Sequence, residues 1–432
     1  MPRKTDSDNP DALGTPSRRA ALRLLDAVLR RGEPLEQALV AATRHVYGPD
    51  RGLAHAIAAE VLRRLPDLDA LIDSVTERPL PDDAKARMAL RVALVQALVL
   101  GTPHHAAIAT VLPLVDGGPR KLVHGVFGAI TRSGVLLPEI PALPPKVEAR
   151  WDAAWGPDMV EGAAQAIAAP PPLDLTLADP GETDHWVAAL GGTSLMPGHV
   201  RVADAAPVTD LPGFAEGRWW VQDIAASLPA RLLADGPRHD GATAIDLCAA
   251  PGGKTLQLAA AGYTVTAVDV SNARIKRLRE NLFRTRLKAE VIAADVLKWA
   301  PAEPADALLI DAPCSATGIF RRHPDVLHRV HPAIIEEMAG LQAKVFLRAA
   351  DWVKPGGRLV FATCSLERAE GEDQLARFLS ARDDYAIDAP DPALLPAGVP
   401  VHADGYVRTL PGMLADKGGC DGFFIVRLRR KG

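Results

Sequence analysis

The chain has 432 residues, of which 48% are hydrophobic and 24% are charged, and this composition is typical of a globular protein with two or three domains. Its formal net charge of −4 excludes a strong overall positive field, so any site for a polyanion must be a local basic cluster. No apolar stretch is long enough to cross a bilayer, because the best candidate, 88–100, contains Arg91 and Gln96 and fits a buried helix. The N-terminus has no apolar signal core, so we expect a cytoplasmic protein without a membrane partner.

The first half of the chain has a helical pattern. The first 17 residues are polar and are predicted to form a disordered tail. Between 18 and 136, apolar residues recur at a spacing of three to four, which predicts an all-α N-terminal bundle with its own core. Its predicted helices cover 19–30, 35–44, 51–64, 68–75, 84–100, 106–115 and 121–132. The proline-rich stretch 137–145 is predicted to be a stiff linker.

The second half changes to a mixed pattern. Residues 146–237 predict a small α+β lead-in module with a helix at 147–168, a strand at 173–177 and a short helix at 184–190. Between 238 and 432, strands and helices alternate, which predicts a doubly wound parallel sheet. The predicted strands are 244–247, 264–270, 289–294, 307–310 and 358–362, and the predicted helices are 254–261, 272–286, 334–353 and 371–381. The apolar run at 423–428 is predicted to add an antiparallel edge strand.

A glycine-rich turn, Asp246-Leu-Cys-Ala-Ala-Pro-Gly-Gly-Lys254, follows the first strand of this sheet. The end of the turn imitates a P-loop, but Cys248 stands where the first P-loop glycine would be, so the phosphate nest is incomplete. The dinucleotide pattern GxGxxG is also absent. The turn therefore favours neither an ATPase nor a dinucleotide site.

Acidic residues follow the next two strands. Asp269 and Asp295 stand where a carboxylate can accept hydrogen bonds from ribose hydroxyls. Either one alone could equally cap the helix that follows its strand. Together with the turn, they predict a nucleoside ligand without phosphates, S-adenosylmethionine. Asp246 could either fix the turn or contact the amino-acid part of that ligand.

Four cysteines are widely spaced, without a CxxC motif or a Cys/His cluster: Cys248, Cys314, Cys364 and Cys420. This spacing predicts reduced thiols, with neither a metal site nor a disulfide scaffold. Cys314 and Cys364 each follow a short apolar run, so both thiols should emerge at the carboxyl edge of one sheet. Two such thiols beside a cofactor turn suggest covalent chemistry on an electrophile, although a lone cysteine is more often a small buried hydrophobe than a nucleophile. Cys420 is interpreted as structural.

Three long motifs resemble the RNA (cytosine-5) methyltransferases of the Sun family, and within it the RsmB-type bacterial 16S rRNA enzymes. They are Asp246 to Thr255, Asp311-Ala-Pro-Cys-Ser-Ala-Thr-Gly318 with Arg322-His-Pro-Asp325, and Ala362-Thr-Cys-Ser365. The resemblance covers about 145–432 and implies the class I S-adenosylmethionine-dependent methyltransferase fold, which is Rossmann-like. The N-terminal region is also similar to the NusB-like RNA-binding domain of RsmB-type enzymes. One departure is Ala369-Glu370-Gly371, where the family has Glu-Glu-Asn.

The resemblance also implies roles for single residues. It implies that Cys364 is the nucleophile that adds to carbon 6 of cytosine, and that Cys314 is the thiol that assists release of the enzyme. Asp311 can hydrogen-bond or protonate the ring at N3, where negative charge develops on addition. The implied S-adenosylmethionine contacts are Asp246, Cys248, Ala249, Ala250, Pro251, Gly252, Gly253, Lys254, Asp269, Asp295 and Asp311.

RNA is the expected partner, 16S rRNA by the resemblance, and the protein is expected to be a monomer. Three basic groups are candidates to hold phosphates: Arg274, Lys276, Arg277, Arg279, Arg284, Arg286 and Lys288; Arg321 and Arg322; and Arg427, Arg429, Arg430 and Lys431. The alternative for the first group is a solvated helix face. Two other functions stay open: a tRNA cytosine-5 methyltransferase, because the catalytic motifs do not encode the substrate, and a non-catalytic RNA-binding factor.

Overall fold

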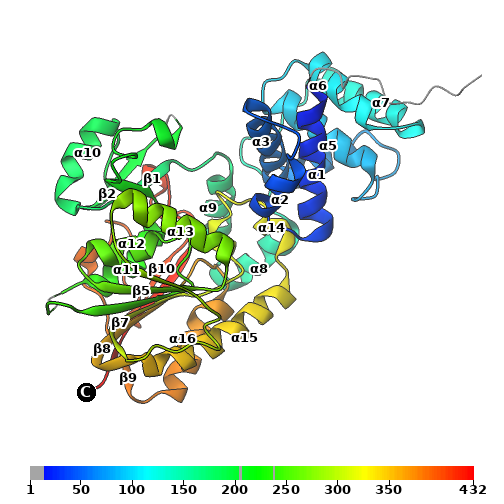
Figure 1. Ribbon diagram of the computed structural model, residues 1–432. Coiled ribbons are helices and arrows are strands. Elements are labelled where there is room, and N and C mark those ends of the chain that lie inside the picture. Colours follow the sequence, from blue (N-terminus) through cyan, green and yellow to red (C-terminus); the bar gives the residue numbers. More distant parts are fainter. Residues whose placement is uncertain (1–13, 204–206, 237–238) are drawn as a thin grey trace, which may run out of the picture. The chain divides into compact units, whose positions relative to one another are not determined.

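A computed structural model of the chain describes residues 14–203, 207–236 and 239–432 (Figure 1). The chain forms two compact units. The helical unit contains the chain up to Arg150 together with Arg322–Val330, and the sheet unit contains Trp151–Arg321 and His331–Gly432. Most of the predicted tail lies outside the described residues, but the first helix already begins at Thr15. None of the described helices combines the length and the apolar character needed to cross a membrane.

The helical unit is a bundle around α5, whose side chains are buried almost throughout from Ala86 to Gln96. Two arginines inside α5 are buried and paired: Arg91 donates to both Asp69 oxygens at 2.8 and 2.7 Å, and Arg87 pairs with Asp69 at 3.0 Å. The predicted helical region is confirmed. Its helices are α1 (Thr15–Arg31), α2 (Leu35–Ala42), α3 (Pro49–Arg63), α4 (Leu65–Asp73), α5 (Lys85–Leu98), α6 (His104–Val111), α7 (Gly118–Ser133) and the short α14 (Val326–Arg329).

Two segments outside the predicted bundle pack within the helical unit. In the segment around α14, Asp325 Oδ2 accepts a hydrogen bond from Leu35 N at 3.4 Å, and His328 Nε2 lies 2.7 Å from Leu62 O. The proline-rich stretch 137–145 is also held, because Arg64 Nη1 donates to Pro138 O at 2.6 Å. The stretch therefore lies along the helices that precede it instead of running free as a spacer.

The sheet unit is built on a large mixed sheet in the order β10-β11-β8-β7-β4-β5-β6, with β9 also paired to β11. The strands from β8 to β6 are parallel, while β11 runs antiparallel to β8, so the predicted fold class is confirmed. The run predicted as an edge strand is not at the edge, because β10 and β9 pair with the other side of β11. The strands are β4 (Thr243–Leu247), β5 (Thr264–Asp269), β6 (Glu290–Ala293), β7 (Ala305–Asp311), β8 (Val353–Thr363), β9 (Tyr385–Ile387), β10 (Val407–Thr409) and β11 (Phe423–Arg430).

Helices cover both faces of this sheet because alternate strand residues point to opposite sides. Leu309 and Val360 share one core with α11, whereas Leu308 and Phe361 share the other with α15 and α16. The helices of this layer are α11 (Ile224–Ala234), α12 (Gly253–Ala260), α13 (Asn272–Thr285), α15 (Pro332–Ala349) and α16 (Glu372–Ala381). Because β4, β5, β7 and β8 are parallel, the loops that follow them lie together at the carboxyl edge of the sheet.

A second, three-stranded antiparallel sheet precedes it in the chain, in the order β2-β1-β3. Asp174 on β1 is fully buried and accepts hydrogen bonds from Arg201 on β2 and from Ile224 N on α11. The single helix predicted at 147–168 is wrong: Gly156 adopts φ 83° and is followed by proline, so the helix divides there. The elements are α8 (Pro145–Trp155), α9 (Pro157–Ile167), β1 (Leu173–Leu177), α10 (Thr183–Leu190), β2 (His199–Val202) and β3 (Trp219–Val221).

Candidate active site

The turn between β4 and α12 depends on two residues with positive φ. Cys248 adopts φ 60° and Gly252, at the start of α12, adopts φ 110°. A Cβ atom at position 252 would lie 2.3 Å from Leu278 Cδ1 on α13, so both the backbone and the space require glycine. The turn therefore packs directly against α13 at the carboxyl end of β4.

Asp269, at the end of β5, anchors this turn. Its Oδ2 accepts a hydrogen bond from Ala250 N at 3.0 Å, and its Oδ1 accepts one from Ser271 N at 2.8 Å. Arg274 on α13 donates to Ala250 O from the other side. Each Asp269 oxygen keeps a further lone pair, so it can still accept from a ribose hydroxyl.

Asp295 is in a more open position. Its side chain is 42% exposed, and its Oδ1 accepts a hydrogen bond from Leu297 N at 2.9 Å. This contact closes a turn, and the alternative of a helix cap is wrong, because the described residues between β6 (Glu290–Ala293) and β7 contain no helix. A cofactor contact from Asp295 stays a prediction.

A group of acidic side chains surrounds one lysine beneath the turn. Asp246 is completely buried; its Oδ2 accepts from Thr255 Oγ1 at 2.5 Å, and its Oδ1 has no hydrogen-bond partner among the described residues. Burial raises the pKa of Asp246 to about 7, and the charges of Asp311 and Asp269 act in the same direction. Lys254 Nζ lies 2.8 Å from Asp311 Oδ2. Asp246, Asp269 and Asp311 face two cations, Lys254 and Arg274, whose Nη1 lies 3.6 Å from Asp269 Oδ2. This excess of acidic groups, with one buried Asp246 oxygen unpartnered among the described residues, fits the cationic ammonium and sulfonium groups of S-adenosylmethionine.

Cys314 and Cys364 meet at the next pair of strand ends. Their Sγ atoms are 3.3 Å apart. The separation follows from the pairing of parallel strands β7 and β8, in which Asp311 lies opposite Ala362 and Ala312 N donates to Ala362 O at 2.9 Å. The contact with Cys364 and burial raise the pKa of the Cys314 thiol well above its ordinary value. The structure thus brings the two predicted reactive cysteines into contact with each other.

Sequence reasoning missed Glu370, which lies behind this pair. Glu370 is completely buried, and its carboxylate accepts hydrogen bonds from both Ser315 N and Ser315 Oγ. The signal in the sequence was the acidic residue six positions after Cys364, noted only as part of a departure from the family. That departure has a structural reason, since a Cβ atom at Gly371 would lie 2.7 Å from Arg408 Nη2 and 2.8 Å from Phe424 Cγ.

The other two cysteines lie in different surroundings. Burial raises the pKa of Cys248 to about 12 and raises that of Cys420 further. Both groups therefore stay thiols at neutral pH, with Cys420 buried and Cys248 half-buried in the turn. This agrees with the structural interpretation of Cys420, and it leaves Cys248 as a residue that shapes the turn.

Most of the basic residues proposed to hold phosphates are used inside the fold. Arg321 is buried and pairs with Asp223 and Asp421, each at 3.1 Å. The C-terminal group is used similarly, with ion pairs from Arg427 and Arg429 to Asp388 and from Arg430 to Asp384. Arg321 and Arg427 are therefore not available to bind phosphates, and for Arg322, Arg429, Arg430 and Lys431 the phosphate surface stays a prediction. On α13, Arg274 and Arg284 donate to backbone oxygens, which leaves the outer side of that helix as a remaining candidate.

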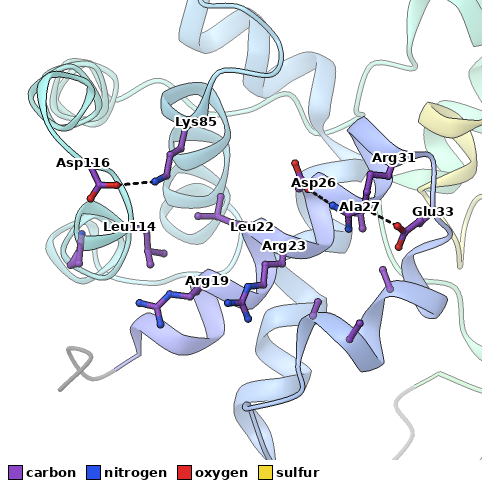
Figure 2. A pocket seen from close by; sticks show the side chains of 14 residues that line it. Arg19, Leu22, Arg23, Asp26, Ala27, Arg31, Glu33, Lys85, Leu114 and Asp116 are labelled. Atoms are coloured by element: carbon purple, nitrogen blue, oxygen red, sulfur yellow. Dashed lines mark hydrogen bonds and ion pairs between the residues drawn. The ribbon is translucent and has the colours of Figure 1, made fainter. Parts of the chain in front are cut away.

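The helical unit has a cavity of about 570 Å³ against α1 (Figure 2). Figure 2 shows that its charged side chains are largely paired, with Lys85 on Asp116 at 3.1 Å and Arg31 on Glu33 at 2.7 Å. Leu22 and Leu114 supply apolar surface between them. Arg19 and Arg23 lie next to each other on α1, so the lining combines this basic pair with a side where acidic and basic groups are paired.

Comparison with known proteins assigns both parts of the chain. The family described as 16S rRNA methyltransferase RsmB/F matches residues 235–429, and the NusB family matches residues 15–132. The chain is 35% identical to ribosomal RNA small subunit methyltransferase B of Xanthomonas campestris pv. campestris, over 96% of this chain and 98% of the relative. It is 34% identical to the protein of that name from Klebsiella pneumoniae subsp. pneumoniae, over the same shares. The crystal structure of PH0851 has the same fold, with a TM-score of 0.73, 23% identity, and coverage of 99% of this chain and 100% of that chain.

Proposed function

The chain belongs to the RsmB/F family of S-adenosylmethionine-dependent RNA methyltransferases, and we propose that it methylates carbon 5 of a cytosine in 16S rRNA through a covalent Cys364 adduct. The observation that carries the proposal is the pair of thiols 3.3 Å apart at the strand ends beside the acid-lined turn. S-adenosylmethionine is the cofactor, and when bound it supplies an electrophilic methyl group.

The chemistry requires a nucleophile because carbon 5 of cytosine reacts poorly by itself. The Cys364 thiolate forms a bond to carbon 6, and the electron pair of the 5,6 double bond makes carbon 5 nucleophilic. After carbon 5 has been methylated, its proton passes to a base, either Cys314 itself or a water molecule beside it. The electron pair of the broken carbon–hydrogen bond restores the double bond, the carbon–sulfur bond breaks, and Cys364 leaves as a thiolate.

The pyrimidine needs polar partners while negative charge develops on it. Asp311 ends β7 three residues before Cys314, and Lys254 lies 2.8 Å from its carboxylate. The pair offers one donor and one acceptor, which can bind the N3 and amino edge of a cytosine. Asp246, Asp269 and the turn from Cys248 to Lys254 bind the cofactor beside it, with Asp295 at the outer end.

The substrate assignment depends on the relatives and on the N-terminal family. Relatives that share a third of their residues over nearly the whole chain carry the small-subunit rRNA name, and the NusB-like region supports RNA recruitment. The target base must leave its stack to reach a thiol, which favours a loop or single-stranded segment. The protein acts as a cytoplasmic monomer. A tRNA substrate is the second candidate, since nothing in the thiol site distinguishes the two RNAs.

The function can be tested on the purified full-length protein with S-adenosylmethionine and either transcribed 16S rRNA or transcribed tRNA. We expect 5-methylcytosine, detected by bisulfite sequencing, at one position of the rRNA. A variant with alanine in place of both Cys314 and Cys364 should give none. Methylation of tRNA alone would replace the substrate assignment, and methylation that persists in the double variant would reject the covalent route.

A further inference from the structure

The outer side of α13 carries an exposed aromatic ring between two arginines. Phe283 is 89% exposed. Arg279 lies four residues before it on the same side of the helix, and Arg286 follows it as the C-cap residue of α13, with φ 59°. In the described part of the chain, neither arginine has an ion pair, whereas Lys276 on the same helix lies 4.0 Å from Glu280.

This combination has the chemistry of a surface for unpaired nucleotides. Phenylalanine is usually buried, and a ring this exposed offers its face to a stacking partner. Proteins that bind single-stranded RNA stack bases on aromatic rings and hold the flanking phosphates with arginine. Asn281, two residues before Phe283 on α13, donates to Pro251 O at 3.2 Å, so Phe283 lies near the outer side of the cofactor turn. An RNA whose target base is in the pocket can therefore place another unpaired nucleotide on this ring.

We propose that Arg279, Phe283 and Arg286 form an RNA-docking face that holds an unpaired nucleotide of the substrate outside the catalytic pocket. The proposal rests on the proposed function, since it assumes an RNA substrate. Charge complementarity commits it to RNA and not to an acidic protein, because only a nucleic acid supplies a stacking base together with phosphates. This docking face would raise the affinity for RNA without taking part in the methyl transfer.

The test compares the full-length wild type with Phe283→Ala and with the double variant Arg279→Ala/Arg286→Ala, using transcribed 16S rRNA. We expect Phe283→Ala to weaken binding at least fivefold with an unchanged salt dependence. The double variant should reduce the slope of log K against log salt by about 2. For both, KM should rise while kcat stays the same. Arg377→Ala, an exposed arginine on α16, is the matched control.

If both variants bind 16S rRNA with the affinity and the salt dependence of the wild type, the docking face is overturned. It is also overturned if the variants lose affinity only when ribosomal proteins are present. Calorimetric binding of S-adenosylhomocysteine must be the same in all variants, which confirms that they fold. If the wild type methylates no RNA, the proposed function fails. If it methylates rRNA and the variants bind as it does, only the docking face fails.

A second, independent observation concerns Glu370. Its Oε2 accepts hydrogen bonds from Ser315 Oγ at 2.9 Å and Ser315 N at 3.1 Å, and Ser315 directly follows Cys314. Ser315 Oγ lies 3.3 Å from Ser365 Oγ, and Ser365 directly follows Cys364. One buried carboxylate therefore ties together the residues that follow the two cysteines.

We propose that Glu370 is a positioning residue that holds the Cys314 and Cys364 loops in contact. Without its carboxylate, the buried Ser315 N–H would lose its acceptor. The two loops are also joined further along, by Gly318 N to Cys364 O at 2.9 Å and by Leu366 N to Thr317 Oγ1 at 3.0 Å, so Glu370 fixes the end of the Cys314 loop that lies next to the thiol. The position of Ser315 depends on three hydrogen bonds to the Glu370 carboxylate. The proposal depends on the proposed function only for the roles of the thiols, not for their separation.

The charge of Glu370 also acts on Cys314. The contact with Cys364 and burial are the larger causes of the raised Cys314 pKa, and the Glu370 charge adds to them. The other charged groups around this site are Glu367, which accepts from Trp151 Nε1 at 3.2 Å, and the pair of Arg408 with Glu372 at 2.6 Å. Removing the Glu370 charge should therefore lower the pH at which Cys314 becomes reactive.

The test follows alkylation of each cysteine by iodoacetamide against pH, resolved by peptide mass spectrometry on the full-length protein. In Glu370→Gln we expect the Cys314 profile to move to lower pH and kcat to fall about tenfold with little change in KM. Glu370→Asp keeps the charge but shortens the reach, so it should keep the wild-type pH profile and still lower kcat. Glu367→Gln is the matched control.

A Cys314 profile in Glu370→Gln that matches the wild type would overturn the proposal, and so would full kcat in Glu370→Asp. An inactive wild type with a shifted alkylation profile would reject the proposed function but leave the positioning role intact. The two failures are therefore distinguishable.

Discussion

Cys314 Sγ lies 3.3 Å from Cys364 Sγ, at the ends of two adjacent parallel strands. The two thiols have different surroundings: Ser315, which follows Cys314, donates to the Glu370 carboxylate, whereas the carbonyl oxygen of Cys364 accepts from Gly318 N at 2.9 Å. The separate roles, with Cys364 as the nucleophile and Cys314 as the thiol that assists release, follow from the family resemblance and are what the cysteine variants test.

Asp269→Ala should weaken binding of S-adenosylhomocysteine at least tenfold, about 1.4 kcal/mol. The change removes the acceptor of both Ala250 N and Ser271 N, so the turn loses its anchor. Isothermal titration calorimetry on the full-length protein measures the effect. Asp416→Ala, an exposed carboxylate elsewhere in the sheet unit, is the control, and equal affinities in the two variants would contradict the anchoring role.

The raised pKa of Asp246 predicts that the stability of the cofactor-free protein depends on pH. Its pKa is about 7 in the folded state against an ordinary 3.8, so its contribution to stability is complete below pH 4 and is lost as the pH rises towards 7. Relative to Asp246→Asn, the wild type should therefore lose a free energy of unfolding on the order of a few kcal/mol between pH 4 and pH 7. Urea unfolding at several pH values measures the free energy of unfolding of both proteins. If the two free energies change with pH in parallel, the raised pKa of Asp246 is contradicted.

Arg321→Met should destabilise the sheet unit by about 3 to 5 kcal/mol, because Asp223 and Asp421 would stay buried without their cation. Chemical denaturation of the full-length protein gives the value, with Arg377→Met as the exposed control. A loss below about 1 kcal/mol, the size of a surface pair, would show that Arg321 is not part of the core.

Gly371→Asn restores the residue of the family and should nevertheless destabilise this chain by about 1 to 3 kcal/mol. The added side chain would meet Arg408 Nη2 and Phe424, which occupy the space above position 371. Thermal unfolding checks the change. Unaltered stability would mean that Arg408 or Phe424 can move away, and Gly371→Ala measures the cost of the Cβ atom alone.

Much of the sheet could be predicted because its strands are short apolar runs bounded by turns. The strands at 244–247 and 307–310 agree with β4 and β7 within a few residues, and the antiparallel β11 also followed from its apolar pattern. Parallel strands end at one edge, which is why two cysteines far apart in sequence could be expected to lie near each other.

Other features depend on long-range contacts that no local pattern records. Arg321 and Arg427 read as surface charges, yet both are buried because acidic side chains from distant segments pair with them. The assignment of Arg322–Val330 to the helical unit follows from contacts such as His328 with Leu62 O, 266 residues apart. Glu370 was missed because an acidic residue in a loop normally faces solvent.

In the proposed mechanism, Cys364 forms the covalent adduct with the cytosine and Cys314 assists its elimination. The most direct measurement is the covalent protein–RNA complex on denaturing gels, for the wild type, Cys364→Ala, Cys314→Ala and the double variant, with 16S rRNA and S-adenosylmethionine. We predict that Cys314→Ala accumulates a complex with methylated RNA, that Cys364→Ala gives neither complex nor methylation, and that the complex is absent in the double variant. A complex in Cys364→Ala and none in Cys314→Ala would contradict the account and reverse the two roles.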